Sequence, residues 1–367
     1  MSRRNDESGG ERESRRDGTG GGSRVDGVWR DPSPERARDG AEPLLSVRDL
    51  RKYYPVTSGV LGRRTGEVKA VDGVSFELYP GETLAVVGES GCGKSTMAET
   101  LIGLHETTGG QVRFRGEPLS ARTDRTVRRE VQMMFQDPFS TLNERMTVGR
   151  IVAEPLVIHG ERAEDREEYV RDLLDTVGLD PDRYYRAFPH ELSGGQRQRV
   201  GIARALALNP SLVVADEPVS ALDVSIQAQI LELLADLQAE FGLTYLVITH
   251  DMSVVRQIAD RVAVMYLGRI VELGGVEEVF DDPQHPYTEA LLSSIPRVTA
   301  DPTEDRRIRL EGSPPDPADP PSGCNFHPRC HLYDDLSGDE RARCEREDPE
   351  SEGKGNRCLA CHFRPEP

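Results

Sequence analysis

The segment 88–96 has the residue types and the spacing of a phosphate-binding loop. It fits the pattern G-x-x-x-x-G-K-[ST], in which the lysine reaches the β- and γ-phosphates of a nucleotide and the hydroxyl binds Mg²⁺. Glycines let backbone N–H groups turn inward toward phosphate oxygens, and the positive end of a following helix adds to the attraction. We therefore predict that these residues hold a nucleotide: Gly88, Glu89, Ser90, Gly91, Cys92, Gly93, Lys94, Ser95 and Thr96.

The chain around this loop has the context that such a loop requires. Residues 84–87 are an apolar run that predicts a buried strand, and Met97, Leu101 and Ile102 follow the loop at helical spacing. A glycine-rich turn that arose by chance would need neither element, so we favour the phosphate loop. We interpret Cys92 as a small residue tolerated in the loop rather than as a nucleophile.

A pair of carboxylates, Asp216 and Glu217, follows the apolar run 212–215. In a phosphate-loop protein, an aspartate at this place orients Mg²⁺ and the next glutamate is the general base that polarises the attacking water. The sequence Asp-Glu-Pro alone would fit an ordinary turn equally well. Its place downstream of the phosphate loop and directly after an apolar strand favours the catalytic interpretation.

The composition limits the partners of the chain. Its 367 residues include 46 Lys and Arg against 64 Asp and Glu, a net charge of −18, which argues against a nucleic-acid backbone as the main partner. The excess of carboxylates suggests a proteome adapted to high salt, the alternative being an acidic tail in an ordinary cytoplasm. The first residues do not resemble a signal peptide, and no run of eighteen apolar residues occurs, so we expect a chain that does not itself cross a membrane.

Composition and periodicity divide the chain into three parts. Residues 1–43 are charged and Gly-rich, so we expect a disordered tail. Residues 44–297 alternate strands and helices, which predicts an α/β domain with a parallel sheet covered on both faces and an inserted helical subdomain at about 137–205. Residues 298–367 are Pro-rich and then Cys-rich and predict a small extension. The clearest helix is 225–241, with an apolar stripe from Ile226 to Phe241 and a stop at Gly242.

The segment 192–199, Leu-Ser-Gly-Gly-Gln-Arg-Gln-Arg, resembles the signature motif of ATP-binding cassette (ABC) ATPases, the energy-coupling subunits of ABC transporters. The resemblance implies a P-loop ATPase fold that binds ATP and Mg²⁺. In that family the signature residues contact the γ-phosphate of the ATP bound by a second ATPase subunit, either identical or a paralogue. In this chain they are Ser193, Gly194, Gly195 and Gln196.

Other segments extend the resemblance residue by residue. Gln136, in Phe-Gln-Asp-Pro, matches the glutamine that contacts Mg²⁺ and the attacking water and senses the membrane subunit, and His250 matches the histidine that bonds the γ-phosphate. Residues 220–223 match the D-loop. Tyr54 is the candidate for stacking on adenine, with Tyr53 as the alternative. The implied catalytic residues are Glu217, His250 and Gln136, and the implied Mg²⁺ site comprises Ser95, Gln136 and Asp216.

A narrower resemblance points to the oligopeptide/dipeptide import branch of the family. It is carried by the segments 189–191 (Pro-His-Glu), 285–288 (His-Pro-Tyr-Thr), 320–324 (Pro-Pro-Ser-Gly-Cys) and 326–330 (Phe-His-Pro-Arg-Cys). It implies a peripheral ATPase on the cytoplasmic face of the membrane that drives transmembrane permeases and, indirectly, serves an extracellular substrate-binding protein. Importers of nickel or oligosaccharides in the same branch stay open as alternatives, because this subunit does not touch the substrate.

Two classes of soluble ABC ATPase are disfavoured. Those of DNA repair and chromosome structure place long coiled coils or zinc modules between the phosphate loop and the signature, and here that gap is short. Those of translation carry two cassettes in one chain, and this chain has a single signature.

Five of the six cysteines lie beyond residue 323. Some members of the branch carry an iron–sulfur cluster on a similar set, and the resemblance implies Cys324, Cys330, Cys344 and Cys361 as ligands, with Cys358 spare. Four thiolates suit a [4Fe–4S] cluster or zinc. The alternative is a docking extension with ordinary cysteines. Since no ATP motif lies beyond His250, we expect the extension to have a structural role and not a catalytic one.

Overall fold

The computed structural model describes residues 41–58, 63–119, 125–136, 141–220, 222–295, 307–354 and 357–363. Most of the tail expected at 1–43 therefore lies outside the described residues, as do Ala221 of the D-loop and the domain boundary expected near residue 298. No helix among the described residues is long and apolar enough to cross a membrane.

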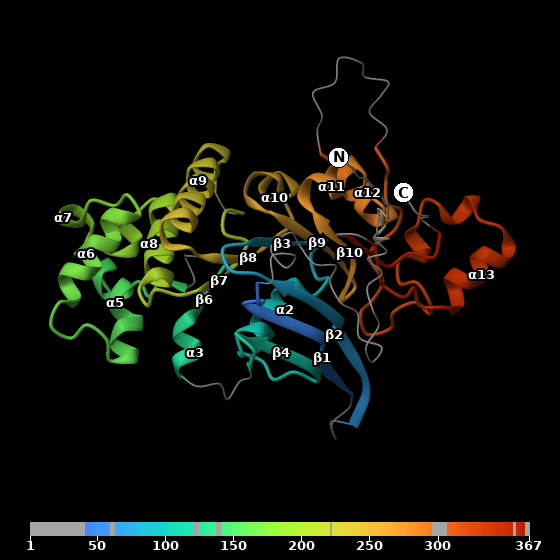
Figure 1. Ribbon diagram of the computed structural model, residues 1–367, viewed down its shortest axis with the longest axis horizontal. Coiled ribbons are helices and arrows are strands. Elements are labelled where there is room, and N and C mark those ends of the chain that lie inside the picture. The colour runs from blue at the N-terminus through green and yellow to red at the C-terminus, as the bar shows by residue number, and fades with distance from the viewer. Residues whose placement is uncertain are drawn as a thin grey trace, which may run out of the picture.

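An eight-stranded sheet forms the centre of the molecule (Figure 1). The strand order is β11 (Glu352–Lys354), β12 (Arg357–Leu359), β10 (Arg269–Gly275), β9 (Arg261–Tyr266), β3 (Thr83–Val87), β8 (Thr244–Thr249), β7 (Leu212–Asp216) and β6 (Val131–Met134). Five consecutive strands, from β9 to the edge strand β6, run parallel, because each apolar run is followed by a helix that returns the chain to the same edge. The remaining three strands are antiparallel additions.

A second, antiparallel sheet packs across the first. Helix α2 (Lys94–Leu101) lies between the two sheets, where Met97, Ala98 and Leu101 share one buried core with residues of both. The helix that carries the phosphate loop is thereby fixed from two sides. The strand order of this sheet is β2 (Arg63–Leu78), β1 (Leu45–Ser58), β4 (Gly109–Phe114) and β5 (Glu117–Pro118).

Helices gather at the β6 end of the main sheet (Figure 1). Apolar faces of α5, α6, α8 and α9 meet there in one core. The prediction for α9 is correct at Ile230 and Leu237 and at its stop, Gly242, but wrong at Phe241, whose side chain is 47% exposed because the last turn extends beyond the core. The helices are α3 (Arg125–Glu130), α5 (Val148–His159), α6 (Arg166–Thr176), α7 (Pro181–Tyr184), α8 (Gly194–Leu206) and α9 (Val224–Phe241).

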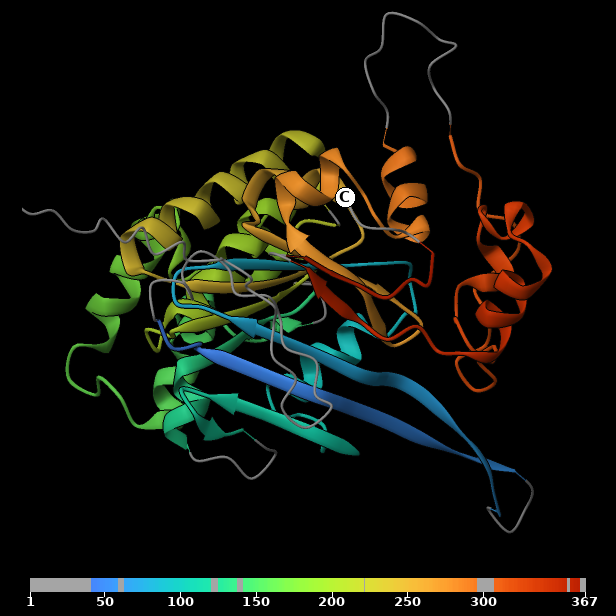
Figure 2. The ribbon, with the colours of Figure 1, turned by 45° about the vertical axis from the view of Figure 1, so that its right-hand side comes forward.

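Helix α10 (Met252–Ile258) packs on the middle strands β3 and β8, next to α9. Helices α11 (Val276–Asp281) and α12 (Pro286–Ser293) lie toward the β10 side of the sheet, and beyond them lies the C-terminal extension with α13 (Gly338–Arg346) (Figure 1). The extension lies against α12 and β10 (Figure 2). Its strand β12 pairs with β10, with Leu359 opposite Glu272 and Cys358 opposite Leu273. The extension is therefore integrated into the main sheet.

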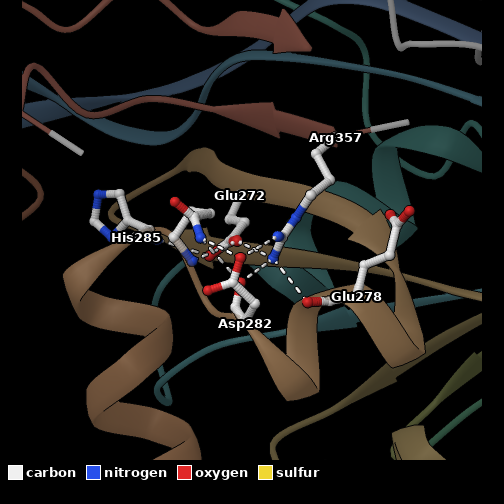
Figure 3. Close-up of polar contacts among 6 residues, drawn as sticks. Glu272, Glu278, Asp282, His285 and Arg357 are labelled. Atoms are coloured by element: carbon white, nitrogen blue, oxygen red, sulfur yellow. Dashed lines mark hydrogen bonds and ion pairs between the residues drawn. The ribbon is translucent and has the colours of Figure 1, made fainter. Parts of the chain in front are cut away.

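One buried ion pair anchors β12 to the cassette (Figure 3). Arg357 donates to Glu272 Oε1 at 3.1 Å and to the carbonyl of Glu278 at 2.9 Å. Glu272 is only 1% exposed and also accepts the backbone N–H of His285 at 2.9 Å. Burial raises the pKa of Glu272, while these hydrogen bonds and the charge of Arg357 oppose the shift.

Candidate nucleotide-binding and catalytic site

The phosphate loop connects β3 to α2 and is shaped by glycines that no other residue can replace. Gly93 precedes α2 with φ +107°, and a Cβ there would lie 2.0 Å from the carbonyl oxygen of Ala70. A Cβ at Gly88 would lie 2.1 Å from the carbonyl oxygen of Met265. The loop thus fits closely against neighbouring strands. Because these glycines carry no side chain, backbone N–H groups can line the face of the loop that is turned toward the phosphates.

Lys94 is held at the mouth of this loop. Its side chain is buried, and Nζ donates to the carbonyl oxygens of Gly88 at 2.7 Å and Glu89 at 3.0 Å. These bonds set the ammonium group before a nucleotide arrives. Burial raises the pKa of Cys92, whose Sγ lies 3.9 Å from Nζ, so this thiol stays neutral and suits a packing role.

Asp216 and Ser95 meet at the end of β7. Asp216 is 5% exposed, and its Oδ1 has no hydrogen-bond partner among the described residues. Burial raises the pKa of Asp216, and a hydrogen bond from Ser95 and the charge of Lys94 act in the opposite direction. An unpartnered buried carboxylate oxygen beside a hydroxyl is the donor set that Mg²⁺ prefers, so these residues fit the ion.

Glu217 contacts two residues that are distant from it in the sequence, Gln136 and His250. Its carboxylate accepts a hydrogen bond from Gln136 Nε2 at 2.6 Å and lies 3.0 Å from His250 Nδ1. Its backbone has φ +46°, which directs the residue after β7 out of the strand. The structure therefore brings together the three residues expected to be catalytic.

A cavity of about 370 Å³ lies along the phosphate loop and is bordered by Gln136 and Glu217. Tyr54 lines it and packs edge-on against His105 at 5.9 Å between ring centroids. Tyr53 instead bonds to Asp72, and burial together with that bond raises the pKa of Tyr53 to about 12. The geometry favours Tyr54 as the residue that faces a base. The other lining residues include Ser90–Thr96 of the loop, Gln136, Glu217, Gly268 and Pro317.

The signature residues lie elsewhere and are not among those lining the cavity. Ser193 precedes α8, and its backbone N–H bonds to Gln196 Oε1 at 2.9 Å, while Gln196 Nε2 donates to Tyr184 at 2.8 Å. The Gln196 side chain is thus engaged within the helical region. A Cβ at Gly195 would lie 2.5 Å from Ile226, so a glycine is needed where α9 packs on α8.

The C-terminal extension reaches the phosphate loop. Arg329 forms two hydrogen bonds to the carboxylate of Glu89, at 2.8 and 3.0 Å. Pro317 of the extension lines the cavity. From the cassette itself, Tyr287 of α12 accepts the backbone N–H of Glu89 at 2.8 Å. Tyr287 and Arg329 belong to segments that carry the family resemblance, but the sequence does not predict their contact with the loop, because no local pattern links them to it.

Four of the C-terminal thiols are close enough to affect one another. Burial and the charges of Cys361, Cys344 and Cys330 raise the pKa of Cys324 to about 12. Cys358 lies apart, buried in the core between the sheets. Within the described part of the chain, no three His, Cys, Asp or Glu side chains are arranged as they would be around a bound metal.

Comparisons with known proteins show the family of the chain. The model of the ABC transporter family matches residues 71–220, and that of the oligopeptide/dipeptide transporter C-terminal region matches residues 271–335. The oligopeptide transport ATP-binding protein AppF of Bacillus subtilis is 52% identical, covering 88% of this chain and 98% of that protein. The dipeptide transport ATP-binding protein DppF of Escherichia coli is 47% identical, covering 87% and 94%.

Solved structures give the same result for the fold. CbiO1 of Clostridium perfringens, part of an ABC transporter complex, superposes with a TM-score of 0.56 at 28% identity, covering 66% of this chain and 92% of that one. The cassette MJ0796, a dimer bound to ADP and Pi in a post-hydrolysis state, gives 0.55 at 30% identity, covering 63% and 98%. This chain therefore belongs to the ABC transporter ATPases, in the branch of oligopeptide and dipeptide transport ATP-binding proteins.

Proposed function

We propose that this ATPase powers the import of di- or oligopeptides through partner permeases, from the cytoplasmic face of the membrane. The observation that carries the catalytic part is the cluster of Glu217, Gln136 and His250 beside the phosphate loop. The names of the relatives, which are peptide transport proteins, support the substrate class. Nickel and oligosaccharides remain the alternative substrates.

Each residue of the site has its own role in the proposed hydrolysis of ATP. ATP with Mg²⁺ would supply the reactive γ-phosphate and a cation that neutralises its charge. Lys94 and the loop N–H groups bind the phosphates, and Ser95 with Asp216 would hold the cation. Glu217 takes a proton from the attacking water, which Gln136 positions, and His250 donates a hydrogen bond to the γ-phosphate. This apparatus works by positioning and charge stabilisation.

We propose further that two ATPase subunits form two composite sites. The signature residues Ser193, Gly194 and Gly195 do not line the cavity of their own chain, which leaves them available to the nucleotide of a partner subunit. The start of α8 presents backbone N–H groups suited to an anion. The dimer of the similar cassette MJ0796 supports this arrangement.

A groove beside Gln136 suits a cytoplasmic segment of the permease. It has a volume of about 260 Å³ and lies between β6 and α5, with Phe135, Ile158 and Arg204 among its lining residues. Ile158 is 65% exposed and Phe135, which precedes Gln136, is 38% exposed. A segment seated here would contact the residue next to the catalytic glutamine, which provides a path from transport to hydrolysis.

Replacing Ile158 with Asp should abolish co-purification with the permease while ATP binding stays at the wild-type level, because a charge would be desolvated in the groove. Val157→Asp is the matched control, since Val157 is 56% exposed but does not line the groove. Pull-down of a tagged permease measures the effect. Equal recovery of the permease with Ile158→Asp and wild-type protein would refute the docking site.

The cysteines Cys324, Cys330, Cys344 and Cys361 are proposed to hold a [4Fe–4S] cluster with a structural role. The proposal rests on the low apolar content of the extension, which needs another source of stability, and it requires the four thiols to adopt an arrangement around a metal that the described residues do not show. Protein purified without oxygen should contain iron and sulfide. Cys330→Ser with Cys344→Ser should remove the iron, whereas Cys358→Ser should retain it. Metal analysis that finds neither iron nor zinc in the wild type would end the proposal.

A further inference from the structure

Every polar group of Glu89, the second residue of the phosphate loop, is bonded. Its backbone N–H donates to Tyr287 at 2.8 Å, and its carbonyl accepts from Lys94 Nζ at 3.0 Å. Both carboxylate oxygens accept from Arg329, at 2.8 and 3.0 Å. Two of these three partners come from residues that follow the last ATP motif, so the shape of the loop depends on distant parts of the chain.

Arg329 reaches the loop from a rigid base. It is the last residue of the short helix η2 (His327–Arg329), which begins directly after Phe326. The Phe326 ring packs against Tyr266 at 5.2 Å and Tyr287 at 5.4 Å between centroids. All three rings are at most 2% exposed. The Arg329 side chain is itself 6% exposed and also donates to the Tyr266 hydroxyl at 3.4 Å. Packing therefore fixes the direction of the guanidinium.

The charge of Glu89 makes this contact relevant to nucleotide binding. A carboxylate in the loop that receives a polyphosphate opposes binding unless a cation balances it. The guanidinium of Arg329 balances it in a bidentate pair, and at such low exposure water and salt screen the pair only weakly. Removal of Arg329 would leave the Glu89 charge uncompensated next to the phosphates.

We propose that Arg329 is a positioning residue for ATP binding: the C-terminal extension holds Glu89 and neutralises it, so that the loop and Lys94 keep the arrangement that receives the phosphates. Arg329 acts through Glu89 and has no contact with the nucleotide. This inference rests on the proposed nucleotide site at the loop and gives the extension a direct part in the ATPase cycle.

Titration of the full-length chain with MgATP tests the proposal. Arg329→Gln should raise the Kd for ATP by about tenfold, as expected when one partner of a desolvated pair is lost. Arg329→Gln combined with Glu89→Gln should return the Kd to within about threefold of wild type, because the unpaired charge is gone. Arg329→Lys keeps the charge but loses the bidentate geometry, so it should give an intermediate Kd. This conservative variant also serves as a control for loss of ATP binding through misfolding.

Arg357→Gln is the matched control, because Arg357 is the arginine of the buried pair that anchors the same extension through Glu272, away from the loop. It should leave the Kd for ATP unchanged. In the assembled transporter, Arg329→Gln should raise KM for ATP with kcat within about twofold of wild type. An unchanged Kd in Arg329→Gln, an equal loss in Arg357→Gln or no recovery in the double variant would overturn the role of Arg329. Wild-type protein that bound no ATP would instead reject the nucleotide site itself.

Discussion

Replacing Glu217 with glutamine should lower kcat for ATP hydrolysis by about 10²–10⁴-fold, while the Kd for ATP stays near the wild-type value. Glutamine keeps the shape and can still bond to Gln136 and His250, but it cannot accept the proton of the attacking water. The loop and Lys94, which bind the phosphates, are untouched. Because hydrolysis would then be blocked after binding, the variant should accumulate as an ATP-bound closed dimer.

Single-turnover hydrolysis and nucleotide retention in the assembled transporter measure this effect. Glu168→Gln is the control, since it makes the same change at an exposed position on α6. If Glu217→Gln hydrolyses ATP at a rate close to that of Glu168→Gln, Glu217 is not the general base.

The second large effect concerns the division of each site between two subunits. Lys94→Ala in one subunit and Ser193→Arg in the other should damage one composite site twice and leave the second intact, so about half of the ATPase activity should remain. Both changes in the same subunit, paired with a wild-type partner, should damage each site once and reduce activity by roughly 10²-fold.

Differently tagged subunits, purified by both tags, give the two arrangements from the same substitutions, so each serves as the control for the other. Equal activities in the two arrangements would contradict composite sites. If the natural partner is a paralogue of this chain, the same design applies with the matching residues placed in that paralogue.

The sequence predicts a part of the site well when the residues that carry its function and the residues that set its backbone shape lie in one short segment. The phosphate loop needs glycines at Gly88 and Gly93, where the backbone leaves no room for a side chain, and Lys94 and Ser95 follow directly. Asp216 and Glu217 are predictable because the end of an apolar strand fixes where they lie. Their geometry agrees with the prediction, although the roles of these residues remain to be tested.

Contacts between distant segments could not be predicted in this way. The pair of Arg329 with Glu89 joins two loops, and the pairing of β12 with β10 adds a short strand of weak periodicity to the main sheet. Neither leaves a pattern in the sequence, because packing across the fold determines both. The link between the acidic composition and high salt remains a prediction.

The most direct test of the account measures ATP hydrolysis by the transporter reconstituted in lipid vesicles with its permeases and substrate-binding protein. Addition of di- or oligopeptides to the binding protein should stimulate hydrolysis, and Glu217→Gln should abolish the stimulated rate. Nickel and oligosaccharides at the same concentrations should have no effect. Stimulation by nickel or an oligosaccharide, with no response to peptides, would contradict the proposed function.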